Sequence, residues 1–161
     1  MTATKRKQTE RWLYGLGYGK KEIDRTVQVY NAEQYGMPPE PVFRTRAEVK
    51  EFVALVQKYP FWNRMWKRFK IKKFKLTFLP KGRTVAWGGP RGIDLPDNPH
   101  GRSLHTILHE MAHAATGGGH RQLFCLVLVN LTHEFAGRTI ADRLRQRYYQ
   151  TGALQRPRRK R

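Results

Sequence analysis

The most regular pattern of apolar and polar positions along the chain lies between residues 46 and 58. Thr45 and Glu48, at its start, have the spacing of a capping box, and Pro60 follows its end. Apolar side chains recur at the helical spacing i, i+3, i+4 and i+7, at Val49, Phe52, Val53 and Val56. The pattern predicts a helix over about 46–58 that Pro60 stops.

Two different periods follow. After Pro60, helical spacing returns at Trp62, Met65, Trp66 and Phe69. This spacing predicts a second short helix. From Lys72 onward the period changes to two, with apolar side chains at Phe74, Leu76 and Phe78. Alternation of this kind is typical of a strand with one buried face.

Two more short strands are predicted before the next helix. They cover Thr84–Trp87 and Ile93–Leu95, and the turns that separate the three strands are Pro80–Gly82 and Gly88–Gly92. Closely spaced strands of this kind predict a small sheet.

Helical patterns dominate the rest of the chain. One helix is predicted over about 102–116, and a second, apolar on nearly every side, over 121–135 with its end at Gly137. A last helix begins at Thr139. The pattern over 24–34 is too short to distinguish strand from helix.

The helix predicted over 102–116 carries the sequence His109-Glu110-Met-Ala-His113. Two histidines four apart on a helix point the same way, so both imidazoles can reach one cation. A glutamate beside the first histidine can polarise a metal-bound water. The motif therefore predicts a zinc site with Glu110 as the catalytic base.

A catalytic zinc ion usually has three protein ligands, so a third is needed. His120 follows the glycines 117–119 and would open the next helix, from which its side chain could turn toward the motif. Glu134 lies on that same helix, while its neighbour His133 projects about 100° away from it. We expect His120 to be the third ligand, with Glu134 as the alternative and no third ligand as the remaining possibility.

Two other histidines, His100 and His105, are interpreted as surface residues. For His105, one turn before His109, the alternative is a group that orients a ligand from outside the first coordination shell.

In the catalytic interpretation, zinc on His109, His113 and His120 lowers the pKa of its water toward about 7 and polarises a carbonyl. Glu110 takes the proton and returns it to the leaving amine. The strand edge near Val85–Gly89 would hold an extended peptide by β-augmentation. Imidazole ligands suit several metals, so the pattern alone does not identify the ion.

The chain is strongly basic. It has 32 Lys and Arg against 12 Asp and Glu, a formal net charge of +20. Such an imbalance indicates an anionic partner, and nucleic acid is the leading candidate. No acidic residue occurs between Glu51 and Asp94, and both termini are basic. The basic residues in that acid-free stretch are Lys58, Arg64, Lys67, Arg68, Lys70, Lys72, Lys73, Lys75, Lys81, Arg83 and Arg91.

Aromatic residues are interleaved with these cations and could form a stacking platform for single strands. Their spacing matches the buried faces of a helix and a strand, so core packing is the preferred interpretation. The residues concerned are Trp62, Trp66, Phe69, Phe74 and Phe78.

The single cysteine, Cys125, excludes an internal disulfide, and its apolar neighbours indicate a buried side chain. At 161 residues, the length predicts one domain with tails. The absence of an apolar stretch of roughly 18 residues and of a signal-peptide core predicts a soluble, cytoplasmic protein without a membrane partner.

The segments Leu108–His113 and Gly119–Phe124 resemble the SprT-like zinc metallopeptidase pattern, in which a second His-Gly-x-x-Phe element supplies the third ligand. Arg121 stands where that element has glycine. Some SprT-type peptidases digest proteins attached to DNA. By analogy, a peptidase motif and a strongly basic chain fit together in one protein.

In layout the chain is also similar to an uncharacterised metallohydrolase family of actinobacteria and their phages. The similarity lies at Arg25–Glu33, around Trp62, in the strands before the motif and at Ala136–Leu144. It covers about residues 24–153. It implies a minimal zincin-like α+β domain, with a small antiparallel or mixed sheet of about three strands packed on the motif helix. It also implies zinc on the three histidines, and it gives no substrate.

Residues 1–23 are then a basic flexible arm and residues 154–161 a basic tail, both outside the resemblance. The implied location is the cytoplasm of a bacterium or of a phage-infected host, with virion association as the alternative.

Three functions remain open. The first is a zinc metallopeptidase that cleaves a protein or peptide substrate near nucleic acid. The second is a nucleic-acid-binding or virion-associated protein with structural zinc, and the third is a peptidase directed at a regulatory protein. The intact Glu110 favours an enzyme, because a structural zinc site has no need for a base.

Overall fold

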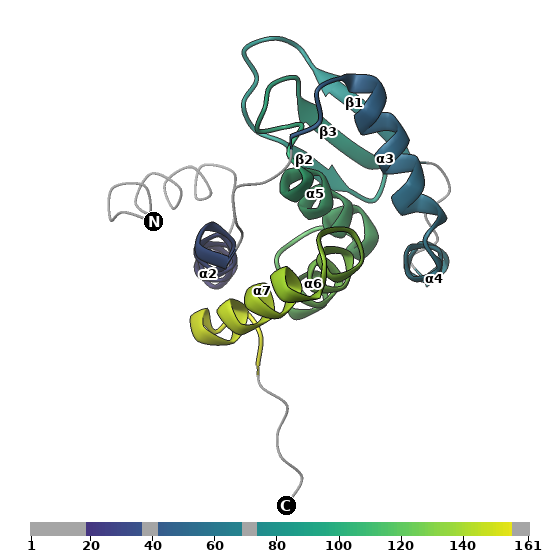
Figure 1. The fold of residues 1–161 in the computed structure, drawn as a ribbon. Coiled ribbons are helices and arrows are strands. Elements are labelled where there is room, and N and C mark those ends of the chain that lie inside the picture. Colours follow the sequence, from purple (N-terminus) through teal and green to yellow (C-terminus); the bar gives the residue numbers. More distant parts are fainter. Residues whose placement is uncertain (1–18, 37–41, 69–73, 156–161) are drawn as a thin grey trace, which may run out of the picture. The chain divides into compact units, whose positions relative to one another are not determined.

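The computed structural model describes residues 19–36, 42–68 and 74–155. The chain divides into two compact units, each described by itself. The sheet unit runs from Pro39 to Gly118, and the helical unit combines Met1–Pro38 with Gly119–Arg161. The whole is α+β, with six helices and one three-stranded sheet among the described residues (Figure 1).

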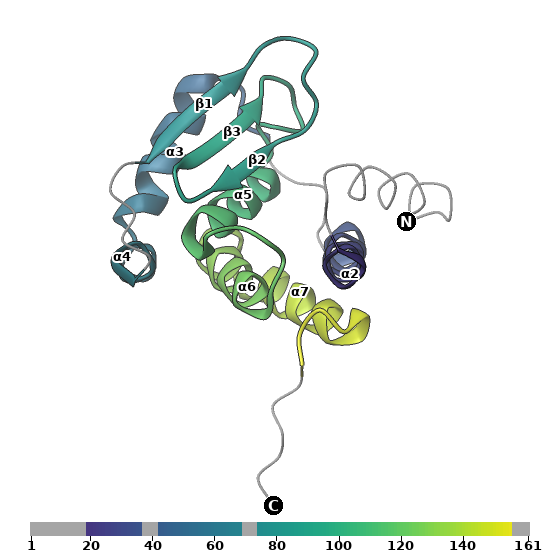
Figure 2. The same cartoon turned by 180° about the vertical axis from the view of Figure 1, so that it is seen from behind.

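The sheet unit contains three helices and all three strands. In chain order they are α3 (Arg46–Lys58), α4 (Pro60–Arg68), β1 (Lys75–Leu79), β2 (Trp87–Gly89), β3 (Gly92–Pro96) and α5 (Leu104–Thr116). β3 lies in the middle of the sheet, parallel to β1 and antiparallel to β2, as Figure 2 shows. The predicted small sheet is therefore confirmed, and it is mixed.

The helix predicted over 46–58 is confirmed at both ends. Thr45 caps it by accepting a hydrogen bond from the backbone N–H of Glu48 at 3.2 Å. Pro60 has a second role as the first residue of α4, where a proline has no N–H to leave unsatisfied. Within α4, the Trp62 side chain is fully buried and its ring meets the Phe74 ring edge-on at 5.9 Å. The core interpretation of Trp62 is thus confirmed, whereas Phe69 and the Trp66 side chain lie outside the described part.

The second predicted strand was misplaced. Thr84–Trp87 was expected, but β2 covers Trp87–Gly89, and Gly88 and Gly89 belong to the ladder instead of the turn. The turn is only Pro90 and Arg91, because Gly89 already pairs with Gly92. Gly92 has φ +146, and a β carbon on it would meet the Lys75 carbonyl oxygen. Close contacts with neighbouring backbone thus require glycine at 92, and the pairing of Gly89 with Gly92 leaves Pro90 and Arg91 as the turn of the hairpin.

Helix α5 packs on β2 and β3. The Ser103 hydroxyl oxygen caps its start by accepting from the Thr106 N–H at 3.1 Å. Gly117, at φ 80, ends it in the left-handed conformation that glycine adopts most readily. All side chains from Thr106 to Ala115 are buried, so the motif helix is a core element of the fold.

The helical unit contains α2 (Lys20–Gly36), α6 (Gln122–Ala136) and α7 (Arg138–Thr151), with α7 packed on the other two. The undecided segment 24–34 is therefore helical, and the helix begins within the last residues of the expected arm. Residues 1–18 of that arm and residues 156–161 of the tail lie outside the described part.

A polar contact joins α2 to α7 inside the helical unit. The Tyr148 hydroxyl donates a 2.7 Å hydrogen bond to Glu33 Oε1, and both side chains are buried. Burial, followed by the nearby Glu33 charge, holds the pKa of Tyr148 well above its usual range. Cys125 on α6 is buried as predicted, and this burial raises the pKa of its thiol to about 12.

None of the helices in the described part of the chain combines the length and the apolar character that crossing a membrane requires.

Candidate metal centre

His109 and His113 occupy successive turns of α5, and their imidazoles meet. Their Nε2 atoms lie 3.1 Å apart, with ring centroids 4.8 Å apart. Both residues are buried, at 4% and 8% exposure. The helical spacing therefore brings two imidazole nitrogens together inside the protein, as expected for side chains four residues apart on a helix.

The separation of the two nitrogens fits a shared metal ion. Two ligands at about 2.0–2.1 Å from a tetrahedral zinc ion lie roughly 3.3 Å from each other. The observed 3.1 Å is close to this value. The buried histidine cluster could thus hold a metal ion, and imidazole is a donor that zinc and several other transition metals accept.

Glu110 is also buried, at 7% exposure, and its carboxylate lies against the backbone of β2. A β carbon placed on Gly88 would lie 2.8 Å from Glu110 Oε2 and would clash with the Glu110 carbonyl oxygen. Only glycine fits there without a shift of backbone. The strand therefore passes directly beside the carboxylate that the motif assigns as base.

β2 forms one edge of the sheet within the described chain, since β3 pairs with it on one side only. The Trp87 side chain is 54% exposed, and its ring lies over Gly89, where an added β carbon would be 2.5 Å from the ring. The space that a side chain at residue 88 would need is thus occupied by Glu110, and the space at residue 89 is occupied by the Trp87 ring.

His105 lies one turn before His109, and their rings meet edge-on at 5.9 Å. It is half-buried and its ring contacts that of His109, so it is not a solvent-facing surface residue. His100 is exposed in the loop before α5, with its Nδ1 3.5 Å from the Thr106 hydroxyl.

His120 belongs to the helical unit and lies just before α6. Its Nδ1 is 3.2 Å from Thr26 Oγ1, and its ring meets Tyr30 and Phe124 edge-on at 5.2 and 4.9 Å. The Thr26 hydroxyl donates its own proton to the Glu22 carbonyl, so its oxygen can accept from Nδ1. This arrangement favours the tautomer that leaves the Nε2 lone pair for a metal.

Arg121 adopts φ −73 and ψ 170, ordinary extended backbone, so this position needs no glycine. The alternative ligand Glu134 and its neighbour His133 are both exposed on α6, whereas His120 is half-buried. Within the helical unit, His120 therefore has the more suitable environment for a metal ligand.

Sequence reasoning did not identify Thr26 and Tyr30 as neighbours of His120, although α2 holds both of them against its ring. They are about ninety residues away in sequence, and no local pattern signals such a contact.

The described cations of the acid-free stretch all point to solvent. They are Lys58, Arg64, Lys67, Lys75, Lys81, Arg83 and Arg91. They give the sheet unit an exposed positive charge without an acidic residue among them in sequence.

Comparison of the chain with protein-family models, with curated proteins and with solved structures gives no match.

Proposed function

We propose that this protein is a zinc-dependent, SprT-like metallopeptidase that acts near nucleic acid. His109, His113 and His120 hold the metal, and Glu110 is the base. The observation that carries the proposal is the pair of buried imidazoles on α5, 3.1 Å apart, next in sequence to a buried carboxylate. The resemblance of the motif segments to SprT-like peptidases supports the same assignment.

Chain connectivity supports His120 as the third ligand. The Gly118 N–H donates to the His113 carbonyl oxygen at 3.0 Å, so the chain turns back at the end of α5. His120 follows two residues later, and its Cα therefore lies within about 7.6 Å of that of Gly118. An imidazole tethered this closely to the end of the motif helix can reach an ion on His113.

A zinc ion on these ligands would acidify a bound water and polarise a substrate carbonyl. Glu110 accepts a proton from the attacking water and gives it to the leaving amine. Its burial beside Gly88 restricts the carboxylate, since the strand blocks movement on that side. A fixed base needs no reorganisation during the reaction.

The edge strand gives the substrate a place to bind. The outer edge of β2 can pair with an extended peptide through backbone hydrogen bonds. Because Gly88 lies against Glu110, a peptide on this edge would run close to the base. A protein or peptide substrate is therefore the class that the site favours.

The decisive experiment compares wild type with Glu110→Gln. Both proteins should bind about one zinc per chain, and only the wild type should cleave unfolded protein substrates, tested with and without DNA. His109→Ala is the control, because it should lose zinc as well as cleavage. Zinc binding by both proteins without cleavage by either would favour the second candidate.

That second candidate is a nucleic-acid-binding or virion-associated protein in which zinc only stabilises the fold. The net charge of +20 and the exposed cations of the sheet unit favour it. Under this alternative, metal removal would lower the melting temperature and DNA binding would persist in Glu110→Gln.

A further inference from the structure

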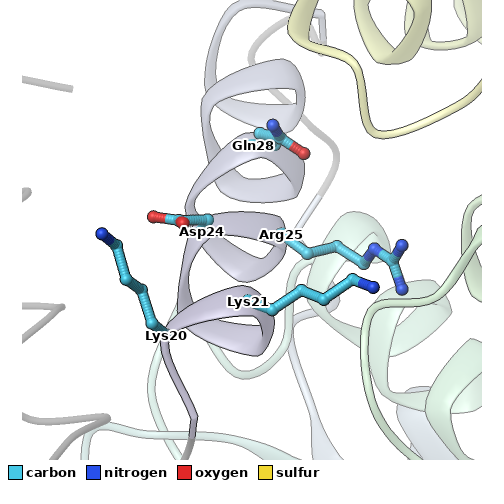
Figure 3. Close-up of a pocket in the computed structure, with 5 residues that line it drawn as sticks. All are labelled: Lys20, Lys21, Asp24, Arg25 and Gln28. Carbon is cyan, nitrogen blue, oxygen red and sulfur yellow. The ribbon is translucent and has the colours of Figure 1, made fainter.

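The N-terminal half of α2 lines an open cavity of about 420 Å³. Five polar or charged side chains of this helix form its described lining, as Figure 3 shows: Lys20, Lys21, Asp24, Arg25 and Gln28. Three of the five are cations and one is an anion. The cavity is therefore a positively charged depression. Its lining residues belong neither to the His109–His113 motif nor to the acid-free stretch.

The charges are separated within the cavity. Lys21 and Arg25 extend toward the same side of the helix, whereas Lys20 and Asp24 extend toward the other side (Figure 3). Lys21 and Arg25 are four residues apart, and like charges at this spacing repel. No ion pair involving either occurs between residues that the structure describes. An anion between the two side chains would remove this repulsion.

Lys21 and Arg25 also differ in how far they are exposed to solvent. Arg25 is half-buried and Lys21 is exposed. A guanidinium held by its surroundings presents paired N–H donors that match phosphate oxygens, and a lysine beside it adds a mobile charge. A phosphate group has enough oxygens to accept hydrogen bonds from both side chains at once, so it is the anion that this pair favours.

Two described residues that lie between the helices of the helical unit and the basic segments of the sequence adjoin α2, namely Gly19 and Gly152. Gly19 immediately precedes Lys20, and the segment before it contains Lys5, Arg6 and Lys7. At the other end, Gly152 lies against Gln28, with 3.7 Å between a β carbon at 152 and Gln28 Nε2. The tail Arg156–Arg161 begins four residues later. Gly19 and Gly152, through which the described chain leads toward these two basic segments, therefore both adjoin α2.

We propose that the α2 cavity binds backbone phosphates of nucleic acid through Lys21 and Arg25. This inference rests on the nucleic-acid part of the proposed function and assigns it to a site on the helical unit. Phosphate contacts of this kind position a protein on nucleic acid without reading its sequence.

The test measures binding of a fluorescent duplex DNA to the full chain by anisotropy over a range of salt concentrations. The variant is Lys21→Ala/Arg25→Ala, and the matched control Lys81→Ala/Arg83→Ala removes one lysine and one arginine from the acid-free stretch. The cavity variant should bind more weakly. Its slope of log affinity against log salt should fall by about 1.8, since each lost phosphate contact removes about 0.9.

The control variant should change the slope by less than half as much. A third variant, Lys21→Arg, keeps the charge and should bind like wild type, which separates loss of charge from damage to α2. Circular dichroism checks that all variants retain their helices.

Three results would overturn the inference. If the control loses as much as the cavity variant, the charge acts without a site. If wild type binds DNA and the cavity variant binds equally well, the cavity is not involved, although the proposed function stands. If wild type binds phosphatidylserine vesicles but no DNA, the cavity serves a membrane surface and the nucleic-acid part of the proposed function fails with it.

Discussion

Gly88 and Glu110 are in direct contact, and the contact tolerates no side chain at residue 88. A β carbon there would clash with the Glu110 carbonyl oxygen and would also lie 2.8 Å from the Glu110 carboxylate. Rotation of the Glu110 side chain relieves only the second clash. The backbone of β2 and the backbone of α5 are therefore held together at Glu110, the residue proposed as the base.

Gly88→Ala should consequently damage both stability and activity. The added methyl group has to push β2 away from α5, and overpacking of this kind costs about 1–3 kcal/mol. We expect a lower melting temperature and, at temperatures where the variant remains folded, slower peptide cleavage with zinc still bound. Calorimetry, zinc analysis and a cleavage assay measure the three effects.

Gly19→Ala is the matched control, because a β carbon there meets nothing within 4 Å. It should leave all three quantities near the wild-type values. A Gly88→Ala protein as stable and active as wild type would show that the strand and the helix separate easily.

The third ligand can be identified by zinc affinity. His120→Ala should weaken zinc binding by more than the roughly 10 to 100-fold that loss of an outer-shell partner costs. Thr26→Val removes the partner of His120 Nδ1 and should fall within that range. Competition with a chromophoric chelator measures both affinities.

His133→Ala and Glu134→Ala are the controls, since both residues are exposed on α6. Neither substitution should change zinc affinity. Loss of zinc in Glu134→Ala together with retention in His120→Ala would transfer the ligand assignment to Glu134.

Local sequence patterns were sufficient for the motif helix. Periodic apolar residues placed α5 close to its observed bounds, and the glycines after it predicted its end at Gly117. The pairing of His109 with His113 follows from helix geometry alone. This part of the site depends only on residues of one helix, and the spacing of such residues can be read from the sequence.

Contacts between elements were not predictable in the same way. The strand β2 was misplaced because its register depends on Gly88 meeting Glu110, twenty-two residues later. Similarly, α2 was left undecided because its helicity is supported by packing on α7, where Glu33 receives the Tyr148 hydrogen bond. Tertiary packing overrides weak local preference in both cases.

Acid should weaken the sheet unit through Asp97. Its carboxylate accepts a 2.6 Å hydrogen bond from Arg46 and a 3.3 Å one from Arg102. The Arg46 hydrogen bond, aided by the charges of both arginines, holds the pKa of Asp97 below its usual range. A depressed folded-state pKa contributes stability above the unfolded value of about 3.9, and this contribution is lost as the pH falls through the folded value.

Thermal unfolding of Asp97→Asn and wild type should therefore differ at pH 7 and converge in strong acid. In an Arg46→Ala background the Asp97→Asn change should matter less, because the main cause of the pKa shift is gone. Equal differences between the two proteins at every pH would contradict this account.

Tyr148 and Glu33 provide a test inside the helical unit. Tyr148→Phe removes the 2.7 Å hydrogen bond to a buried carboxylate, and we expect a loss of about 1–3 kcal/mol of unfolding free energy. Tyr149→Phe, on the adjacent residue of α7, is the control and should cost much less. In the double variant Glu33→Gln/Tyr148→Phe, the loss should be smaller than the sum of the two single losses, because both remove the same contact.

The Tyr148–Glu33 pair also predicts that the folded protein loses stability at alkaline pH. Since the folded-state pKa of Tyr148 is raised, its contribution is complete below the unfolded value of about 10 and is lost as the pH rises through the folded value. Wild type should therefore lose stability above about pH 10 more steeply than Tyr148→Phe, as measured by urea unfolding at several pH values. Parallel losses in the two proteins would assign the alkaline sensitivity to groups other than Tyr148.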